Sequence, residues 1–148
     1  MKIYLDVCCL NRPFDDHQQD RVRLESEAVL TILTRCQAKT YTLLNSEVID
    51  VEISKIPDND RQEKVRLLSS ISQNYLVVNE KIERRASEIQ ELSFRPYDAL
   101  HIACAEMARA DAFLTTDDRL LHKAANRKHF LKVRLENPVK WLMEDIGR

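Results

Sequence analysis

Short apolar runs alternate with longer helical patterns along this chain, and no other feature limits its possible folds as strongly. The runs are near-continuous, as is typical of strands covered on both faces: KIYLD (2–6), YTLLN (41–45), YLVVN (75–79), AFLTT (112–116) and KVRLE (132–136). Helical periodicity occupies the intervals, over residues 19–38, 46–56, 60–73, 80–92, 97–110, 118–126 and 138–146. This alternation predicts an α/β fold, a sandwich around a mainly parallel central sheet of about five strands.

Length and composition predict one domain over residues 1–148. A chain of this size buries about 68–70% of its extended surface, so no disulfide is needed to hold it together. No internal repeat, low-complexity tract or Gly/Ser linker divides it. The four cysteines lack C-x-x-C spacing, and we expect reduced thiols that pack as small hydrophobic side chains. Gly147 is the only glycine, which excludes the glycine-rich phosphate loops of Rossmann and Walker motifs.

Charge narrows the possible functions further. Lys plus Arg total 23 and Asp plus Glu total 24, for a net charge of −1. No global basic field can therefore hold nucleic acid, and phosphate binding must come from a local patch or a metal. The start of the chain shows no signal-peptide pattern, and no run approaches the roughly 18 apolar residues of a membrane span. We therefore expect a cytoplasmic protein without a membrane segment.

Acidic residues directly follow two of the predicted strands. Asp6 ends the first run with no basic residue beside it, and Asp117 with Asp118 follows AFLTT. Ligands of parallel α/β sheets bind outside the carboxyl ends of the strands, so these acids are expected at a common binding edge. Asp117 is preferred to Asp118 because it lies nearer the strand end. An aspartate in TTDD is also a good N-cap for a helix beginning near Arg119, and that alternative stays open.

A third acid lies on the apolar side of a predicted helix. Glu52 falls within the stripe that Ile49, Ile53 and Ile56 form at helical spacing. A carboxylate directed at the core is costly unless it meets a cation or hydrogen-bond donors. The alternative is a residue at the stripe edge that reaches water. Glu47 is a competitor, but it lies about 140° away around the helix, so we choose Glu52.

A fourth acid, Asp98, opens the segment DALHIACAEMARA, which is apolar enough to be nearly surrounded by protein. Alone, Asp98 is explained as an N-cap or first-turn acid favoured by the helix dipole. His101 follows one turn later, and we interpret it as a hydrogen-bonded histidine at the edge of the core.

The four acids Asp6, Glu52, Asp98 and Asp117 are more informative as a set than singly. Clustered carboxylates repel each other, so they either hold protons or bind a hard divalent cation through oxygen. Mg²⁺ and Mn²⁺ both accept such a ligand set. The chemistry that fits is phosphodiester hydrolysis, in which a metal lowers the pKa of a bound water and neutralises charge at the phosphoryl group.

The segments that carry these acids, IYLDV, NSEVIDVEI, YDALHIACA and FLTTDDRL, resemble the PIN-domain nuclease family, and specifically its VapC-like ribonucleases. The resemblance covers nearly the whole chain, and DALHIA followed by LTTD is its most specific part. It implies a three-layer α/β/α fold, an endoribonuclease site dependent on Mg²⁺ or Mn²⁺, and commonly a homodimer. Many members are toxins neutralised by a small antitoxin. Asp6, Asp98 and Asp117 would hold the main cation, and Glu52 would bind a second cation or orient the attacking water.

The chain departs from the family pattern after its first acid. A small hydroxyl or amide residue often follows there, whereas this chain has Val7, Cys8 and Cys9. Asn11 is a candidate for the missing polar contact. The following residues, 11–23, read as a polar loop that enters the first helix. Its arginines, Arg12, Arg21 and Arg23, either touch a phosphate backbone or form a solvated surface.

Three other functions remain as alternatives. A non-catalytic PIN-like scaffold would bind RNA or an antitoxin without cleaving. A phosphatase of the haloacid-dehalogenase kind would use Asp6 as nucleophile, with Asp117 and Asp118 as metal acids. That chemistry expects an Asp two residues after the first, where Cys8 stands. A cysteine hydrolase built on Cys8 or Cys9 with His101 has the least support.

Overall fold

The computed structural model describes all 148 residues and confirms the α/β sandwich. Its central sheet has five strands in the order β3-β2-β1-β4-β5. They are β1 (Lys2–Leu5), β2 (Thr42–Ser46), β3 (Asn74–Leu76), β4 (Ala112–Leu114) and β5 (Leu135–Glu136). Every neighbouring pair is parallel. The chain order reverses between β1 and β4, and such a switch point is where an open parallel sheet forms its binding crevice.

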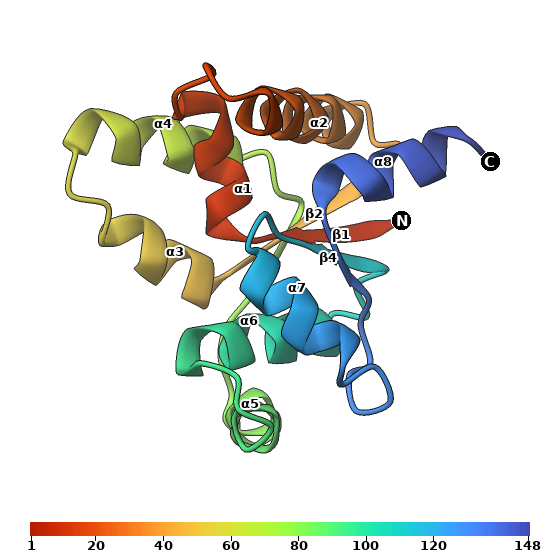
Figure 1. Cartoon of the computed structure of the whole chain (residues 1–148). Helices are drawn as coiled ribbons and strands as arrows, with labels where there is room; N and C mark the ends of the chain where they lie inside the picture. The colour runs from red at the N-terminus through yellow and green to blue at the C-terminus, as the bar shows by residue number, and fades with distance from the viewer.

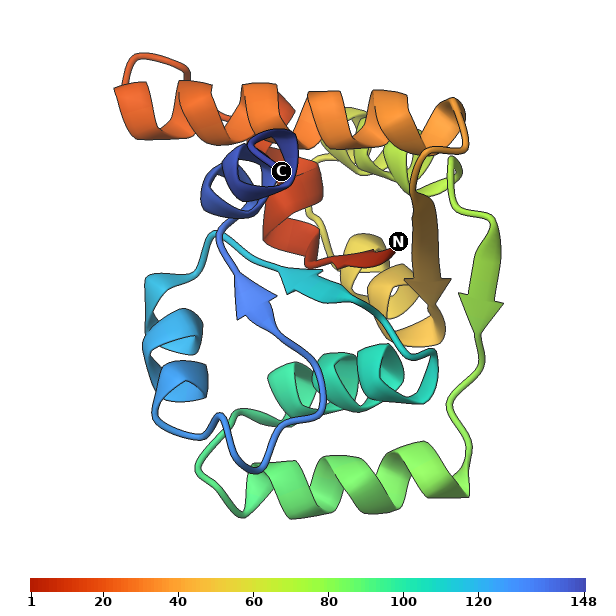
Figure 2. The same cartoon turned by 90° about the vertical axis from the view of Figure 1, so that its right-hand side faces the viewer.

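Helices cover both faces of the sheet (Figures 1 and 2). On one side lie α1 (Val7–Asn11), α2 (Asp20–Gln37), α4 (Asn59–Ser69) and α8 (Pro138–Ile146). On the other lie α5 (Glu80–Gln90), α6 (Pro96–Met107) and α7 (Asp118–Ala125), with α3 (Glu47–Ser54) at the end of β2. None of the helices combines the length and apolar composition needed to cross a membrane.

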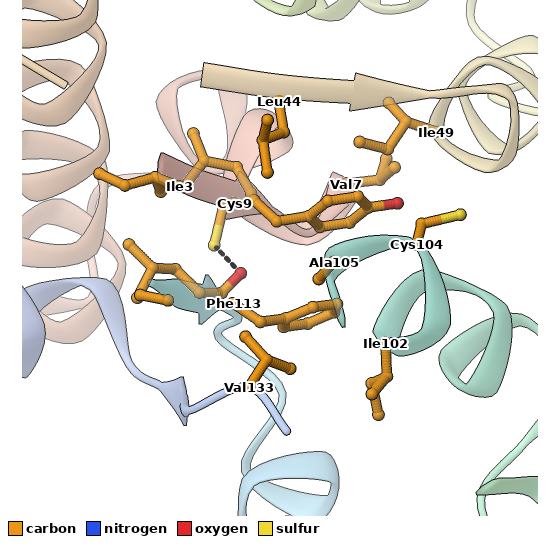
Figure 3. Close-up of a cluster of buried hydrophobic side chains, with 14 of the residues drawn as sticks. Ile3, Val7, Cys9, Leu44, Ile49, Ile102, Cys104, Ala105, Phe113 and Val133 are labelled. Atoms are coloured by element: carbon orange, nitrogen blue, oxygen red, sulfur yellow. Dashed lines mark hydrogen bonds between the residues drawn. The ribbon is translucent and has the colours of Figure 1, made fainter. Parts of the chain in front are cut away.

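The core is centred on β1, whose residues Ile3, Tyr4 and Leu5 are at most 1% exposed. The ring of Tyr4 stacks on Phe113 of β4 with 5.2 Å between centroids. Figure 3 shows this cluster, with Cys9 pointing from α1 toward β4. There the Cys9 thiol donates a hydrogen bond to the Leu114 carbonyl at 3.3 Å. The buried cysteines thus pack as small hydrophobic side chains, as predicted, and all four are free thiols.

Several predicted strands extend beyond the observed ones, and the differences are largest at the two edges of the sheet. The ladder from β2 to β3 runs only from Asn74 to Leu76, because the Val78 N–H donates to the Glu47 carboxylate at 2.7 Å instead of continuing it. As an edge strand, β3 also leaves Tyr75 49% exposed, so the expectation of cover on both faces fails there. At the other edge, β5 is limited to Leu135 and Glu136.

A short helix, α1, was not predicted from the sequence. It begins directly after Asp6, whose side chain caps it, and a single 3₁₀ turn over Arg12–Phe14 follows. The segment 11–23 is therefore partly helical, and its polar side chains pair with one another. Arg12 and Arg21 both donate to Glu25, which is only 1% exposed, at 2.9 and 3.2 Å. The Arg12 contact ties the 3₁₀ turn to α2.

Candidate metal centre

Asp6 lies at the carboxyl end of the central strand and is 8% exposed. Its backbone N–H donates to the Leu114 carbonyl at 2.9 Å, which holds the end of β1 against β4. One carboxylate oxygen accepts from the Val7 N–H and the other from the Thr115 hydroxyl, both at 2.8 Å. No cationic side chain pairs with it. Burial therefore raises the pKa of Asp6 above its ordinary value, while His101 and the Thr115 hydrogen bond act in the opposite direction.

Glu52 meets a hydrogen-bond donor on α6, which resolves its unusual position on an apolar helix face. The His101 Nε2 lies 2.5 Å from Glu52 Oε1, and the carboxylate keeps 27% of its side chain exposed. His101 itself is fully buried, so our placement of it at the edge of the core was wrong, although the hydrogen bonding was expected. The imidazole thus connects the buried core to a carboxylate that faces the binding edge.

A chain of hydrogen bonds fixes the orientation of His101. The Ile49 N–H donates to Ser46 Oγ at 3.2 Å, Ser46 Oγ lies 2.7 Å from the Tyr4 hydroxyl, and that hydroxyl lies 2.6 Å from His101 Nδ1. Burial holds the pKa of Tyr4 well above its usual range, so its hydroxyl keeps its proton. If Ser46 donates to Tyr4 and Tyr4 to Nδ1, every hydrogen bond has one donor and one acceptor. Nε2 then carries the ring proton and donates a hydrogen bond to the Glu52 carboxylate.

Asp98 occupies the first turn of α6 and makes no hydrogen bond or ion pair. It is half-buried, and burial is the largest cause that raises its pKa from 3.8 to about 6. The neighbouring charges of Asp6 and Asp117 raise it further, and His101 lowers it. A carboxylate without a partner beside two other carboxylates is the arrangement that a bound cation stabilises.

Asp117 caps α7 with one carboxylate oxygen and leaves the other oxygen without a hydrogen bond. Its Oδ1 accepts from the backbone N–H groups of Arg119 and Leu120 at 3.0 and 3.3 Å, so the N-cap interpretation is correct. Its Oδ2 makes no hydrogen bond. The neighbouring Asp118 is instead held by Arg21 through two hydrogen bonds of 2.6 and 2.8 Å. This geometry favours Asp117 over Asp118, as the position of the strand end does.

Two of the carboxylates and the imidazole form one tight group. One ligand atom each from Asp6, Glu52 and His101 lies within 4.8 Å of the other two. Asp98 and Asp117 are not part of this tight group, although the charges of Asp6 and Asp117 raise the pKa of Asp98. Both imidazole nitrogens are already hydrogen-bonded, so the oxygens of the acids are the ligands free to bind. An oxygen-rich set of this kind fits a hard divalent cation.

Several contributors to this site were not identified from the sequence. Thr115 donates to Asp6, and its hydroxyl also accepts from the Asp117 N–H at 3.2 Å, so it links two of the acids. Its position between the strand and Asp117 in LTTD was the available signal. The Cys8 thiol lies 3.3 Å from the Thr115 hydroxyl and accepts from the Thr116 N–H. Cys8 therefore contacts the two threonines that lie between β4 and Asp117.

Asn11 and Glu47 both have other partners. The Asn11 side chain donates to the Val7 carbonyl and accepts from Arg61 of α4, at 3.1 and 3.2 Å. Glu47 accepts a hydrogen bond from the Val78 backbone N–H beside β3. Glu52 instead contacts His101, which lies in the same tight group as Asp6.

Comparison with known proteins identifies the class of this fold and site. The family model described as PIN domain matches residues 3–126. The chain therefore belongs to the PIN domain family. A comparison with curated protein sequences gave no significant match.

Solved structures share the fold at low sequence identity. VapBC2 from Rickettsia felis, bound to a DNA fragment from the promoter, has a TM-score of 0.64 at 17% identity over 93% of this chain and 98% of that chain. A toxin–antitoxin complex from Klebsiella pneumoniae has a TM-score of 0.60 at 15% identity over 92% and 97%. VapBC-1 from nontypeable Haemophilus influenzae has 0.59 at 12% identity over 93% and 98%.

Proposed function

We propose that this chain, as a single PIN-like domain over residues 1–148, is a metal-dependent endoribonuclease that hydrolyses RNA phosphodiester bonds. One observation carries the proposal: carboxylates from four separate segments gather at the carboxyl edge of the sheet without a neutralising cation. They are Asp6 after β1, Glu52 on α3, Asp98 on α6 and Asp117 before α7. Membership of the PIN domain family supports the same reaction class.

The surroundings of each acid suggest a different role for it in the reaction. Asp6, Asp98 and Asp117 would hold a Mg²⁺ or Mn²⁺ ion, directly or through water. A bound ion of this kind neutralises charge at the phosphoryl group and lowers the pKa of a coordinated water. Glu52 is kept in place by His101, and it orients the attacking water or holds a second ion. Tyr4 and Ser46 hold His101 from behind, so the carboxylate position is set by the core rather than by a mobile side chain.

The partner assignment extends the proposal to regulation. The solved structures that share the fold of this chain include toxin–antitoxin complexes. This supports the proposal that the chain is a VapC-like toxin, which a small antitoxin keeps inactive in the cytoplasm. We also propose a homodimer. Expression of the chain alone should arrest growth, and co-expression of a small reading frame beside its gene should relieve the arrest. Light scattering on the purified protein measures the dimer directly, and a monomeric mass removes that part of the proposal.

The decisive experiment measures cleavage of a panel of structured RNAs with Mn²⁺ or Mg²⁺, and with a chelator. Asp98→Asn is the sharpest variant, because Asp98 has no hydrogen bond to lose and the fold should remain intact. Asp60→Asn on α4 is the matched control, since Asp60 forms only an exposed ion pair with Lys64. Wild type and the control should cleave with metal, whereas Asp98→Asn and Asp6→Asn should not.

Two results would redirect the assignment. Cleavage by Asp6→Asn and Asp98→Asn at the wild-type rate would show that these acids are not the catalytic site. Metal binding measured by calorimetry without cleavage of any RNA would favour the non-catalytic scaffold. The phosphatase alternative requires a trapped acyl-phosphate on Asp6 during turnover, and its absence removes that alternative.

A further inference from the structure

A hollow of about 370 Å³ lies directly beside the acids, between the start of α6 and one face of α7. Asp98 and Asp117 form part of its lining, so it is continuous with the candidate metal centre. Its other charged side chains are basic: Arg95, Arg119, Lys123 and Arg127. We call this the basic hollow. Its size is in the range of pockets that accept a small ligand or one nucleotide.

The four cations of the basic hollow have no acidic partner. Elsewhere the exposed or half-buried arginines are largely neutralised: Arg12 and Arg21 by Glu25, Arg85 by Glu106, and Arg134 by Glu144. In the hollow, Lys123 donates only to the Ser93 carbonyl and Arg127 only to a backbone carbonyl. Unpaired positive charge thus lies directly beside the metal acids, although the net charge of the chain is −1. Lys81 and Arg84 on α5 are also unpaired, but they line a separate hollow.

Local geometry explains how the cations come together. Arg119 and Lys123 are four residues apart on α7, so they lie on the same face of that helix. Arg95 is the N-cap residue of α6, and Asp98 follows it in the first turn. The two helices therefore line the same hollow with cations and with two carboxylates. Arginine suits this position because its planar fork binds a phosphate through two N–H groups and stacks on a base.

We propose that the basic hollow binds the RNA backbone and the nucleotide next to the bond that is cleaved. This inference rests on the proposed ribonuclease function. It adds that the RNA strand is bound on the side of the acids where α7 and the start of α6 lie. Because the whole protein has no basic field, a local patch must supply the attraction to phosphate. Binding through these cations requires no metal. It is therefore separable from catalysis by the acids.

The test measures binding of a fluorescent single-stranded RNA to the full chain in a chelator, where no cleavage occurs, over a range of salt concentrations. The variant is Arg119→Ala/Lys123→Ala. Lys81→Ala/Arg84→Ala on α5 is the matched control, because it removes the same charge types from exposed residues without salt bridges. The control pair lines a separate hollow of about 800 Å³ that contains none of the four acids.

The α7 double variant should bind at least tenfold more weakly. Its plot of log affinity against log salt should be shallower by about 1.4, because each phosphate contact to a single strand contributes about 0.7. With Mn²⁺ present, it should raise KM more than it lowers kcat, since the lost contact is made in ground state and transition state alike. The control pair should leave the affinity and the slope near wild type.

Unchanged affinity and slope in the α7 variant would overturn the inference. An equal loss in the α5 control would also overturn it, because the attraction would then be a property of total charge. Either result leaves metal-dependent cleavage by the wild-type protein intact. Conversely, absence of any RNA cleavage would remove the proposed function, while the binding measurement would still report whether the hollow holds RNA.

Discussion

Replacing Asp98 by asparagine should stabilise the metal-free protein at alkaline pH, even though it abolishes the proposed activity. The reason lies in the surroundings of Asp98, a half-buried carboxylate without a hydrogen bond, beside Asp6 and Asp117. Burial and these neighbouring charges raise its pKa from 3.8 to about 6. As the pH rises, the folded state therefore keeps the proton of Asp98 to a higher pH than the unfolded chain does. Stability from this group is complete below the unfolded pKa and is lost as pH rises toward the folded pKa.

The size of the effect follows from the same numbers. One pKa unit corresponds to about 1.4 kcal/mol, so the change from 3.8 to about 6 sets an upper limit of about 3 kcal/mol. Solvent reaches part of the carboxylate, and screening reduces this to roughly 1.5 kcal/mol. The dipole of α6 favours the charged form and offsets about 0.5 kcal/mol. Asp98→Asn should therefore gain about 1 kcal/mol above pH 7, or about 2–4 °C in melting temperature.

The assay is thermal unfolding in a chelator at pH 8 and pH 4.5, for the wild type, Asp98→Asn and the control Asp60→Asn. At pH 8 the Asp98 variant should melt above the wild type, and the gap should be smaller at pH 4.5, where the folded state holds the proton. Mg²⁺ should stabilise the wild type at pH 8 and stabilise Asp98→Asn less. A variant that melts below the wild type at pH 8 would refute the reasoning. So would a gap that is the same at both pH values.

Four further substitutions test the site and the contacts that support it. Tyr4→Phe leaves His101 with an unpaired buried nitrogen, so urea unfolding should show a loss of about 1–3 kcal/mol together with slower RNA cleavage. Glu25→Ala removes a buried acceptor that two arginines share, and it should cost about 1–3 kcal/mol by the same measurement, because Arg12 keeps Asp15 and Arg21 keeps Asp118. Asp118→Ala should retain RNA cleavage and Asp117→Ala should lose it, and the reverse order would show that Asp118 is the site acid.

Much of the binding edge was predictable because its signals are local. Asp6 ends a strand, Asp117 follows another, and the rules of parallel sheets bring such ends to one edge. Glu52 was identifiable because a carboxylate on an apolar helix face requires a partner. The partner itself was not identifiable. His101 lies 49 residues away in sequence, and its contact with Glu52 depends on how α3 and α6 cross.

The cations beside the site could not be predicted from the sequence. From the sequence, Arg12, Arg21 and Arg23 were the arginines considered for phosphate contact. In the structure they pair with Glu25, Asp118 and Asp20, among others. The unpaired cations that adjoin the acids lie instead on α7, just after it and at the start of α6. Charge pairing between distant segments cannot be deduced from local patterns, because it depends on which side chains the fold places within a few ångströms.

The amino-acid sequence alone determined the alternation of strands and helices, the parallel sheet, the order of the four acids and the resemblance to PIN domains. Periodicity and spacing carry that information because backbone geometry repeats over a few residues. Only the tertiary structure decided that α1 follows Asp6, that Tyr4 and His101 fix Glu52, and that a basic hollow adjoins the acids. These features depend on contacts between segments remote in sequence, which the packing of helices on the sheet selects.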